Sequence, residues 1–288
     1  MKLPAFEYAC PTTLTEAVAL LSARDGEAKL IAGGQSLVPM LAFRLAAPAL
    51  LVDLRKLDQL RKREVAGSGV VLGSMVRWCD ILDDARLAAA HPLLREAVTH
   101  VAHYQIRNRG TIGGSIAHAD PAAEMPGIAL VCEAEIATVR ASGVRLIKAQ
   151  DFFIGPLMTL LEADEIITEV RFPAWPSGRR WGFQEFSRRR GDFALAAAAV
   201  WYDQEGGKAC NAHVAVIGVG DRPHRLTAVE TVLNGRAVDA ATIAAAEAAT
   251  CAAVDPQADI HASADYRRAL AGTMVERALK AAALRAPA

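Results

Sequence analysis

Two short glycine-rich segments contain the residue types in this chain that are best suited to binding chemistry. Residues 32–36 read Ala-Gly-Gly-Gln-Ser, and residues 110–115 read Gly-Thr-Ile-Gly-Gly-Ser. Backbone N–H groups of paired glycines can approach a ligand closely, because no Cβ stands in the way. Successive N–H groups that face one way form an anion-binding nest, and a helix that begins directly after them adds its dipole. Two such segments converging on one point would suit a pyrophosphate and hence a dinucleotide, whereas each alone can be an ordinary tight turn.

Two further patterns are weaker. Residues 67–72, Gly-Ser-Gly-Val-Val-Leu, nearly match the Rossmann pattern G-x-G-x-x-G, but Leu72 stands where the third glycine belongs. We therefore reject a Rossmann nucleotide site there. His100 and His103 are three residues apart and can share one helix face, yet no third ligand accompanies them. A role at a helix-end surface or an interface is favoured over metal binding.

Composition restricts the class of protein. The chain has 288 residues, 52% of them hydrophobic, and a formal net charge of +0. This balance argues against a nucleic-acid binder, which would need a basic patch. No run of apolar residues is long enough to span a membrane, and the first residues lack the apolar stretch of a signal peptide. Five scattered cysteines without C-x-x-C indicate neither an iron–sulfur cluster nor a structural metal, so we expect a cytoplasmic protein that binds no metal itself.

The pattern of apolar residues predicts alternating helices and strands in the first part of the chain. Thr13 and Glu16 form a capping-box pattern ahead of a helix. Apolar runs and turn residues then predict the remaining elements. We expect helices at 14–21, 36–45, 78–90, 92–102 and 122–132, and strands at 29–32, 50–52, 64–65, 70–72, 135–139, 144–147 and 166–172.

A break at residues 173–178, Pro-Ala-Trp-Pro-Ser-Gly, predicts a domain boundary. Beyond it we expect strands at 181–188, 194–203 and 212–219, followed by helices that begin near residues 227, 239 and 264. Strands followed by helices indicate a small α+β domain. The predicted domains are 1–175, divided into parts of about 1–55 and 56–175, and 179–288.

Three segments resemble one known family. Residues 30–39, residues 109–115 with 119–126, and residues 187–194 are similar to motifs of the FAD-binding medium subunits of molybdenum hydroxylases. Carbon monoxide dehydrogenase, quinoline oxidoreductase and xanthine dehydrogenase belong to this group. The resemblance covers essentially the whole chain in order. It implies an α+β fold: a two-part vanillyl-alcohol-oxidase-like (PCMH-type) FAD-binding domain over 1–175 and a small C-terminal α+β domain.

The resemblance also implies which residues contact FAD. Most of them lie in the three similar segments, Val101 and Leu161 correspond to apolar residues of the family, and no catalytic residue or metal ligand is carried over. The implied cofactor-binding residues are Leu30, Ile31, Ala32, Gly33, Gly34, Gln35, Ser36, Leu37, Val101, Gly110, Thr111, Ile112, Gly113, Gly114, Ser115, Asp120, Glu124, Leu161, Asp192 and Phe193.

Within this set the resemblance suggests individual roles. N–H groups of residues 33–36, with the Ser36 hydroxyl, are expected to bind the diphosphate without cations, and residues 111–115 to supply a second set of contacts. Glu124 would accept hydrogen bonds from ribityl or ribose hydroxyls, unless it is a helix-surface acid. Asp120 either caps a helix that starts at residue 122 or contacts the cofactor.

The remaining implied contacts concern the rings of FAD. Val101 and Leu161 would pack on flavin or adenine, with a plain core position as the alternative. Asp192 and Phe193 are expected beside the isoalloxazine. Some relatives have a tyrosine at the position of Phe193, and phenylalanine can shield a ring face but cannot donate a hydrogen bond.

The resemblance implies an electron-transfer subunit of a larger enzyme. Substrate would be hydroxylated at a molybdenum–pterin centre in a large subunit, and electrons would pass through two [2Fe-2S] clusters of a small subunit to FAD here and then to an external acceptor. The family's assembly is a dimer of heterotrimers, and residues 190–196 tilt the substrate class towards N-heteroaromatics. The alternatives are a self-contained FAD-dependent oxidase or reductase, and a scaffold that has lost FAD.

Overall fold

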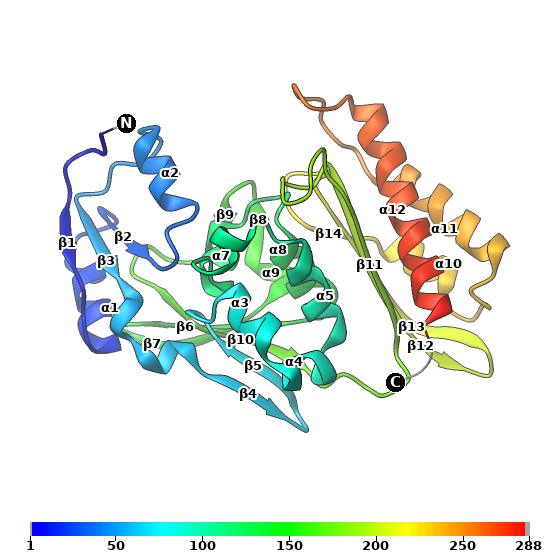
Figure 1. Ribbon diagram of the computed structural model, residues 1–288, viewed down its shortest axis with the longest axis horizontal. Coiled ribbons are helices and arrows are strands. Elements are labelled where there is room, and N and C mark those ends of the chain that lie inside the picture. Colours follow the sequence, from blue (N-terminus) through cyan, green and yellow to red (C-terminus); the bar gives the residue numbers. More distant parts are fainter. Residues whose placement is uncertain (1, 286–288) are drawn as a thin grey trace.

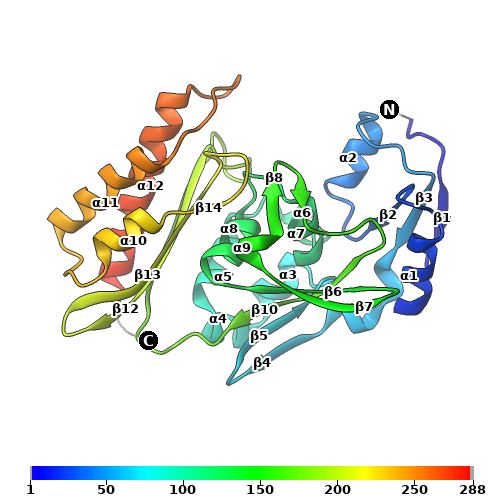
Figure 2. The same cartoon turned by 180° about the vertical axis from the view of Figure 1, so that it is seen from behind.

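Three groups of buried apolar side chains organise the chain into three units that follow one another in sequence. The computed structural model describes residues 2–285. Figures 1 and 2 show an N-terminal unit, a central unit and a C-terminal unit in a row, seen from opposite sides. Each unit has its own sheet, so a site that uses more than one unit must form where their loops and edges meet.

The N-terminal unit pairs a helix with a three-stranded parallel sheet of order β1-β3-β2. The predicted cap is present, because Thr13 Oγ1 accepts a hydrogen bond from the Glu16 N–H at 3.2 Å. Buried residues of α1 and of the strands form the core of this unit. Its elements are β1 (Glu7–Ala9), α1 (Leu14–Ser22), β2 (Ala28–Ile31), α2 (Leu37–Ala42) and β3 (Leu50–Asp53).

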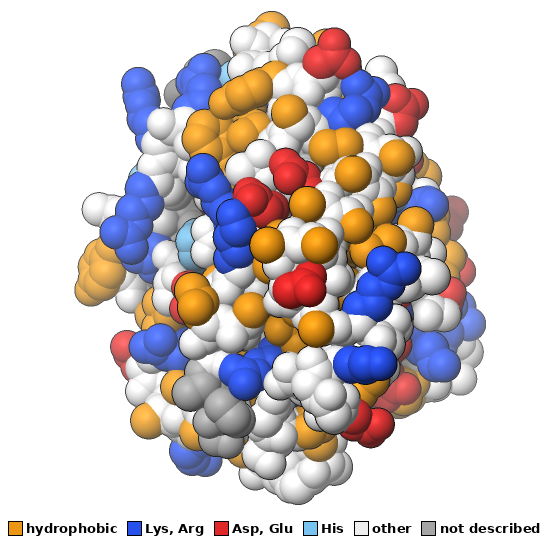
Figure 3. Space-filling model, turned by 90° about the vertical axis from the view of Figure 1, so that its right-hand side faces the viewer, with side chains coloured by type: hydrophobic (Ala, Val, Ile, Leu, Met, Phe, Trp, Pro, Cys, Tyr) orange, Lys and Arg blue, Asp and Glu red, His pale blue; other side chains and the backbone are white. Residues whose placement is uncertain are grey.

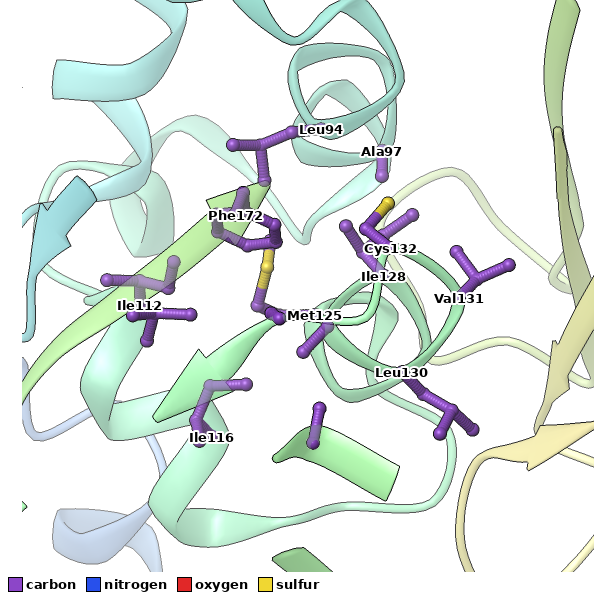
Figure 4. Close-up of a cluster of buried hydrophobic side chains, with 14 of the residues drawn as sticks. Leu94, Ala97, Ile112, Ile116, Met125, Ile128, Leu130, Val131, Cys132 and Phe172 are labelled. Atoms are coloured by element: carbon purple, nitrogen blue, oxygen red, sulfur yellow. The ribbon is translucent and has the colours of Figure 1, made fainter. Parts of the chain in front are cut away.

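The central unit is a five-stranded antiparallel sheet of order β4-β5-β10-β6-β7 covered by short helices. Helix α8 is buried at all eight positions. Figure 4 shows its apolar side chains packed among those of neighbouring helices and of β10. The elements are β4 (Arg63–Ala66), β5 (Gly69–Gly73), α3 (Trp78–Asp83), α4 (Ala85–Ala90), α5 (Pro92–His100), α6 (Tyr104–Arg107), α7 (Ile112–His118), α8 (Glu124–Val131), β6 (Glu135–Arg140), β7 (Gly143–Lys148), α9 (Ala149–Phe152), β8 (Phe153–Gly155), β9 (Met158–Thr159) and β10 (Ile166–Pro173).

The C-terminal unit is a four-stranded antiparallel sheet whose two faces are both buried. In β12 the side chains of Ala197, Ala199 and Trp201 join the central core, whereas those of the alternate residues pack under the helices. Figure 3 shows the outer side of this unit, where charges of both signs are interspersed with apolar side chains. The elements are β11 (Arg180–Phe186), β12 (Ala196–Glu205), β13 (Lys208–Ile217), β14 (His224–Arg225), α10 (Thr227–Leu233), α11 (Ala240–Ala253) and α12 (Ala264–Leu284).

Several predicted boundaries are wrong for local reasons. The helix predicted at 78–90 is two helices, because Asp84 takes an extended conformation and its side chain accepts the N–H of Arg86 to start α4. The helix predicted at 36–45 stops at Ala42, and Arg44 adopts a left-handed backbone with φ of 59°. The helix predicted at 122–132 begins only at Glu124.

Other elements were not predicted or were shifted. The strands β11, β12 and β13 are displaced by a few residues from the ranges predicted for them. Very short elements carry too little periodicity to be detected from sequence. This group comprises β1, α6, α9, β8, β9 and β14.

Candidate functional site

One cavity of ≈ 470 Å³ draws residues from the N-terminal unit, the central unit and the loop after β11. This volume lies in the range of small-molecule sites. All the predicted cofactor-binding residues line it except Ile31 and Ile112. Ile112 is fully buried in the central core, and Ile31 instead packs behind the first glycine segment, 3.5 Å from the place a Gly34 Cβ would occupy.

The two glycine segments touch each other at this cavity. A Cβ on Gly33 would overlap the carbonyl oxygen of Arg109 and would lie 2.9 Å from the Cα of Gly110. Only glycine allows such an approach of two backbones. The sequence expectation that the two segments converge is therefore confirmed, and their contact forms one wall of the cavity.

The first segment presents unpartnered N–H groups. Residues 33–36 connect β2 to α2, and Gly34 has a φ of +73°, which favours glycine. The backbone N–H groups of residues 33–36 find no acceptor in the described part of the chain, although Gly34 and Ser36 accept hydrogen bonds through their carbonyls from Val38 and Met40. The Gln35 side chain donates to the Gly33 carbonyl at 3.1 Å. This segment has the properties of an anion nest.

The second segment uses its N–H groups internally. Residues 112–115 are not a loop but the first turn of α7, whose N-cap is Thr111. Thr111 Oγ1 accepts from the Gly114 N–H at 3.1 Å, and the Gly113 N–H donates to the Ser74 carbonyl at 2.9 Å. Ile112 and Ser115 also donate to backbone carbonyls. The N–H groups of residues 112–115 are therefore already used within the protein, while Thr111, Gly113, Gly114 and Ser115 line the cavity. The expected second set of ligand contacts from residues 111–115 stays a prediction.

Glu124 is the buried acid of the cavity. It is the first residue of α8 and only 7% exposed, so the alternative of a helix-surface acid is wrong. Burial raises the pKa of its carboxyl to about 7, an effect that nearby Asp120 increases and His100 opposes. A hydrogen bond from its own backbone N–H also opposes this rise of the pKa.

Asp120 also lines the cavity, but it does not cap α8. Its Oδ1 accepts a hydrogen bond from the Ala122 N–H at 2.9 Å, which forms a turn before the helix. The N-cap of α8 is Ala123, and no side chain caps it. The proposed cap for a helix starting at residue 122 is therefore corrected to a turn, and the cavity-facing alternative keeps its geometric basis.

The apolar residues predicted to contact the rings of FAD differ in how far they are buried. Val101 is 7% exposed, belongs to the central core and still lines the cavity, as Leu161 does. Phe193 is 61% exposed and stands beside Asp192 at the cavity. An exposed aromatic ring at a cavity edge leaves a large apolar surface for a ligand or a partner to cover.

Several cavity residues were not found from sequence. Ser74 is 3% exposed, and its hydroxyl oxygen has no hydrogen-bond partner within the described residues. Glu165 is held by Arg145, whose Nε lies 2.7 Å from Glu165 Oε1. Lys29 is the one lysine or arginine that lines the cavity in residues 2–285. Ser74 and Glu165 lie outside the recognised motifs, so only the folded chain could reveal them, whereas Lys29 directly precedes the motif of residues 30–39.

The described residues include no group of three or more histidine, cysteine or acidic side chains arranged to hold a metal ion. His100 ends α5 and its Nε2 lies 3.9 Å from Glu96 Oε1, while His103 precedes α6. In residues 2–285 we find no helix that combines the length and apolar character required to cross a membrane.

Two family models match consecutive parts of this chain. A family model described as the FAD binding domain in molybdopterin dehydrogenase matches residues 4–175. A second model, described as the CO dehydrogenase flavoprotein C-terminal domain, matches residues 181–282.

Individual proteins are similar over their full length. The nicotine 6-hydroxylase medium subunit of Paenarthrobacter nicotinovorans is 41% identical over 285 residues, which cover 99% of this chain and 100% of that protein. The carbon monoxide dehydrogenase medium chain of Hydrogenophaga pseudoflava is 39% identical over 279 residues, 97% of each chain. A chain in the crystal structure of quinoline 2-oxidoreductase from Pseudomonas putida 86 matches with a TM-score of 0.94 at 39% identity, covering 98% of both chains.

Proposed function

The chain belongs to the FAD-binding medium subunits of the molybdenum hydroxylases, and from this premise we propose that it transfers electrons through FAD held in the cavity. It is an oxidoreductase subunit with FAD as its cofactor. The proposed step takes electrons from the [2Fe-2S] clusters of a small subunit and delivers them to an external acceptor.

One observation carries the assignment of the cofactor to this cavity: the N–H groups of residues 33–36 have no acceptor in the described part of the chain. Four backbone N–H groups of residues 33–36 face no acceptor, which suits a diphosphate bound by neutral donors. The Glu124 carboxyl is buried and can accept from hydroxyls. The Ser74 hydroxyl is buried without a partner. A ligand that offers acceptors to these N–H groups, hydroxyls to Glu124 and a partner to the buried Ser74 hydroxyl fits the site.

FAD and the protein residues would have different roles in the site. FAD, when bound, supplies the redox chemistry, and the protein binds, orients and shields it. Residues 33–36 would hold the diphosphate, and Glu124 would fix a polyol by accepting its hydroxyl protons in hydrogen bonds. Val101, Leu161 and Phe193 would form apolar walls for rings. Phe193 would shield one ring face without donating a hydrogen bond.

We propose that the partners are a small iron–sulfur subunit and a large subunit with a molybdenum–pterin centre, in a dimer of heterotrimers. Two similar proteins are named for nicotine and quinoline, which are both N-heteroaromatics, and this supports the same substrate class for the complex. The hydroxylation would then occur in the large subunit, so residues of this chain would not select the substrate.

The test is a purification of the tagged full chain from its source cell, with an absorbance spectrum and metal analysis. An untagged extract on the same column serves as the control. FAD, iron and molybdenum that co-elute with two further chains, together with dye reduction by quinoline or nicotine, are the expected result. A lone chain with FAD that turns over a substrate without metals would overturn the proposal in favour of a self-contained flavoenzyme.

A further inference from the structure

A short segment, residues 160–165, lies between the N-terminal unit and the central unit. Its ends continue into β9 and β10 of the central unit, and Leu161 and Glu165 line the cavity. On the side of the N-terminal unit, the Ser22 hydroxyl of α1 donates to Asp164 Oδ2 at 3.4 Å. The position of this segment therefore affects the shape of the cavity.

One arginine bonds both ends of this segment. Arg145 Nη2 donates to the carbonyl of Leu160 at 2.9 Å, and Arg145 Nε donates to Glu165 Oε1 at 2.7 Å. Nη2 also donates to Glu165 Oε2. A guanidinium presents its donors in a rigid plane, so it can hold both sites in one geometry, which a lysine cannot do. We call these contacts of Arg145 with Leu160 and Glu165 the latch.

The Glu165 carboxylate is fully used inside the protein. Its side chain is buried, and it accepts from the Thr138 hydroxyl on β6 at 2.5 Å and from the Glu162 N–H at 3.1 Å, in addition to the two bonds from Arg145. Burial acts against the charged form, but these hydrogen bonds keep the pKa of Glu165 below its ordinary value. A carboxylate with these donors has no need of a ligand hydroxyl, so Glu165 holds the segment in place at the cavity wall.

Arg145 itself lies outside the cavity. It belongs to β7, the edge strand of the central sheet, and it does not line the cavity. Figures 1 and 2 show β6 and β7 reaching towards the N-terminal unit. Arg145 can therefore act on a bound ligand through residues 160–165 and not by contact.

We propose that the latch sets the position of Leu161 at the FAD cavity, which makes Arg145 and Glu165 positioning residues for the cofactor. The inference rests on the proposed function, because it assumes that FAD occupies the cavity. A wall that is already ordered needs no further ordering when a ligand binds, whereas a loose wall must be ordered by the ligand. Without the latch, part of the binding free energy of FAD is used to order residues 160–165.

The experiment measures the Kd for FAD of deflavinated full-length variants by flavin fluorescence. Arg145→Met keeps the apolar stem and removes the guanidinium, and we expect its Kd to rise about tenfold. The matched control is Arg179→Met, because Arg179 makes a similar double contact with Asp203, at 2.8 and 3.0 Å, and does not line the cavity. The control should lower the melting temperature and leave the Kd unchanged. An unchanged Kd for folded Arg145→Met, or an equal rise in both variants, would overturn the inference.

Arg145→Lys separates the latch from a general effect on stability. It keeps a cation beside Glu165 but cannot bond both ends of the segment in one plane. We expect a Kd between those of the wild type and Arg145→Met. A Kd as high as that of Arg145→Met would contradict the role of the ion pair with Glu165.

A measurement on the unmodified chain keeps the test valid if the variants fail to fold. Hydrogen exchange without FAD should show protected amides at Leu160, Glu162 and Glu165, because each of them donates to an acceptor within the chain. Rapid exchange there without FAD, followed by protection when FAD binds, would show that the ligand orders the segment and would refute the latch alone. No FAD binding by the unmodified chain would instead refute the proposed function.

Discussion

The two glycine segments look alike in sequence and behave differently in the structure. In residues 33–36 the glycines hold a loop whose N–H groups have no acceptor in the described chain. In residues 110–115 the glycines lie against Ser74 and Trp78, and the N–H groups of 112–115 already donate to protein acceptors. The first segment is thus suited to bind a ligand, whereas the second is suited to pack the wall behind it.

A Gly-Gly pair followed by a serine thus specifies close backbone approach, not a particular hydrogen-bond partner. In the first segment the approach leaves N–H groups directed at the cavity. In the second, the same freedom lets α7 begin against the end of β5. Substitutions in the first should therefore change FAD affinity, and those in the second should change the free energy of unfolding.

The largest effect is expected for Gly113→Ala. A Cβ there would lie 2.7 Å from the Ser74 carbonyl oxygen and 2.8 Å from the Ser74 Cα, and backbone atoms cannot move aside easily. Overpacking of this kind should lower the free energy of unfolding by about 3 kcal/mol, measured by urea denaturation of the chain without FAD. The control is Gly67→Ala, where nothing lies within 4 Å. Equal stability of both variants would contradict the packing role.

Gly34→Ala should affect binding more than folding. Its φ of +73° is unfavourable for alanine, so the loop should rearrange at a cost of about 1–2 kcal/mol. Loss of two of the hydrogen bonds to the charged diphosphate would raise the Kd for FAD about a hundredfold. Gly207→Ala, with φ of +78° and open space around it, carries the same strain away from the cavity. If both variants bind FAD equally, the nest is not the binding site.

Thr111→Val removes the cap of α7 while keeping the shape of the side chain. The hydrogen bond from the Gly114 N–H at 3.1 Å is lost, so we expect about 1 kcal/mol less stability. Thermal unfolding without FAD measures this, and Thr111→Ser should restore most of it. A variant with unchanged stability would show that the second segment does not depend on its internal hydrogen bonds.

Ser36→Ala should give the smallest effect of the four variants. In contrast to Thr111→Val, it should change the Kd for FAD and leave the stability of the chain unchanged. No side-chain hydrogen bond of Ser36 caps α2, so the melting temperature of the chain without FAD should stay constant. One lost hydrogen bond to the ligand would raise the Kd by about threefold to tenfold. Fluorescence titration with FAD measures this Kd. An unchanged Kd would show that the Ser36 hydroxyl does not contact FAD.

Features that depend on residues close in the sequence could be predicted, and features that depend on distant residues could not. The Thr13 cap depends on neighbours within a few residues, and nearly all the residues that the family resemblance assigned to FAD line the cavity. Other lining residues, such as Ser74 and Glu165, were not predicted. Ile112 was assigned to the cavity because the motif is a continuous run, but the turn of α7 directs its side chain into the core. A motif is a continuous run of residues, but in a helix only some of its side chains face the cavity.

Other features depend on partners distant in sequence. Nothing near Gly113 in the sequence indicates that its N–H donates to the Ser74 carbonyl. Glu124 itself was recognised, but its burial follows from the packing of α8 between two sheets. These properties arise when separate units meet, and a single sequence carries no periodic signal for such contacts.

Amide hydrogen exchange of the chain with and without FAD distinguishes a ligand-binding first segment from an internally bonded second one. Exchange slows when an N–H gains a stable hydrogen bond. We expect amides of residues 33–36 to exchange rapidly without FAD and to become protected when it binds, while those of 112–115 are protected in both states. Unchanged exchange at 33–36, or new protection confined to 112–115, would contradict this distinction.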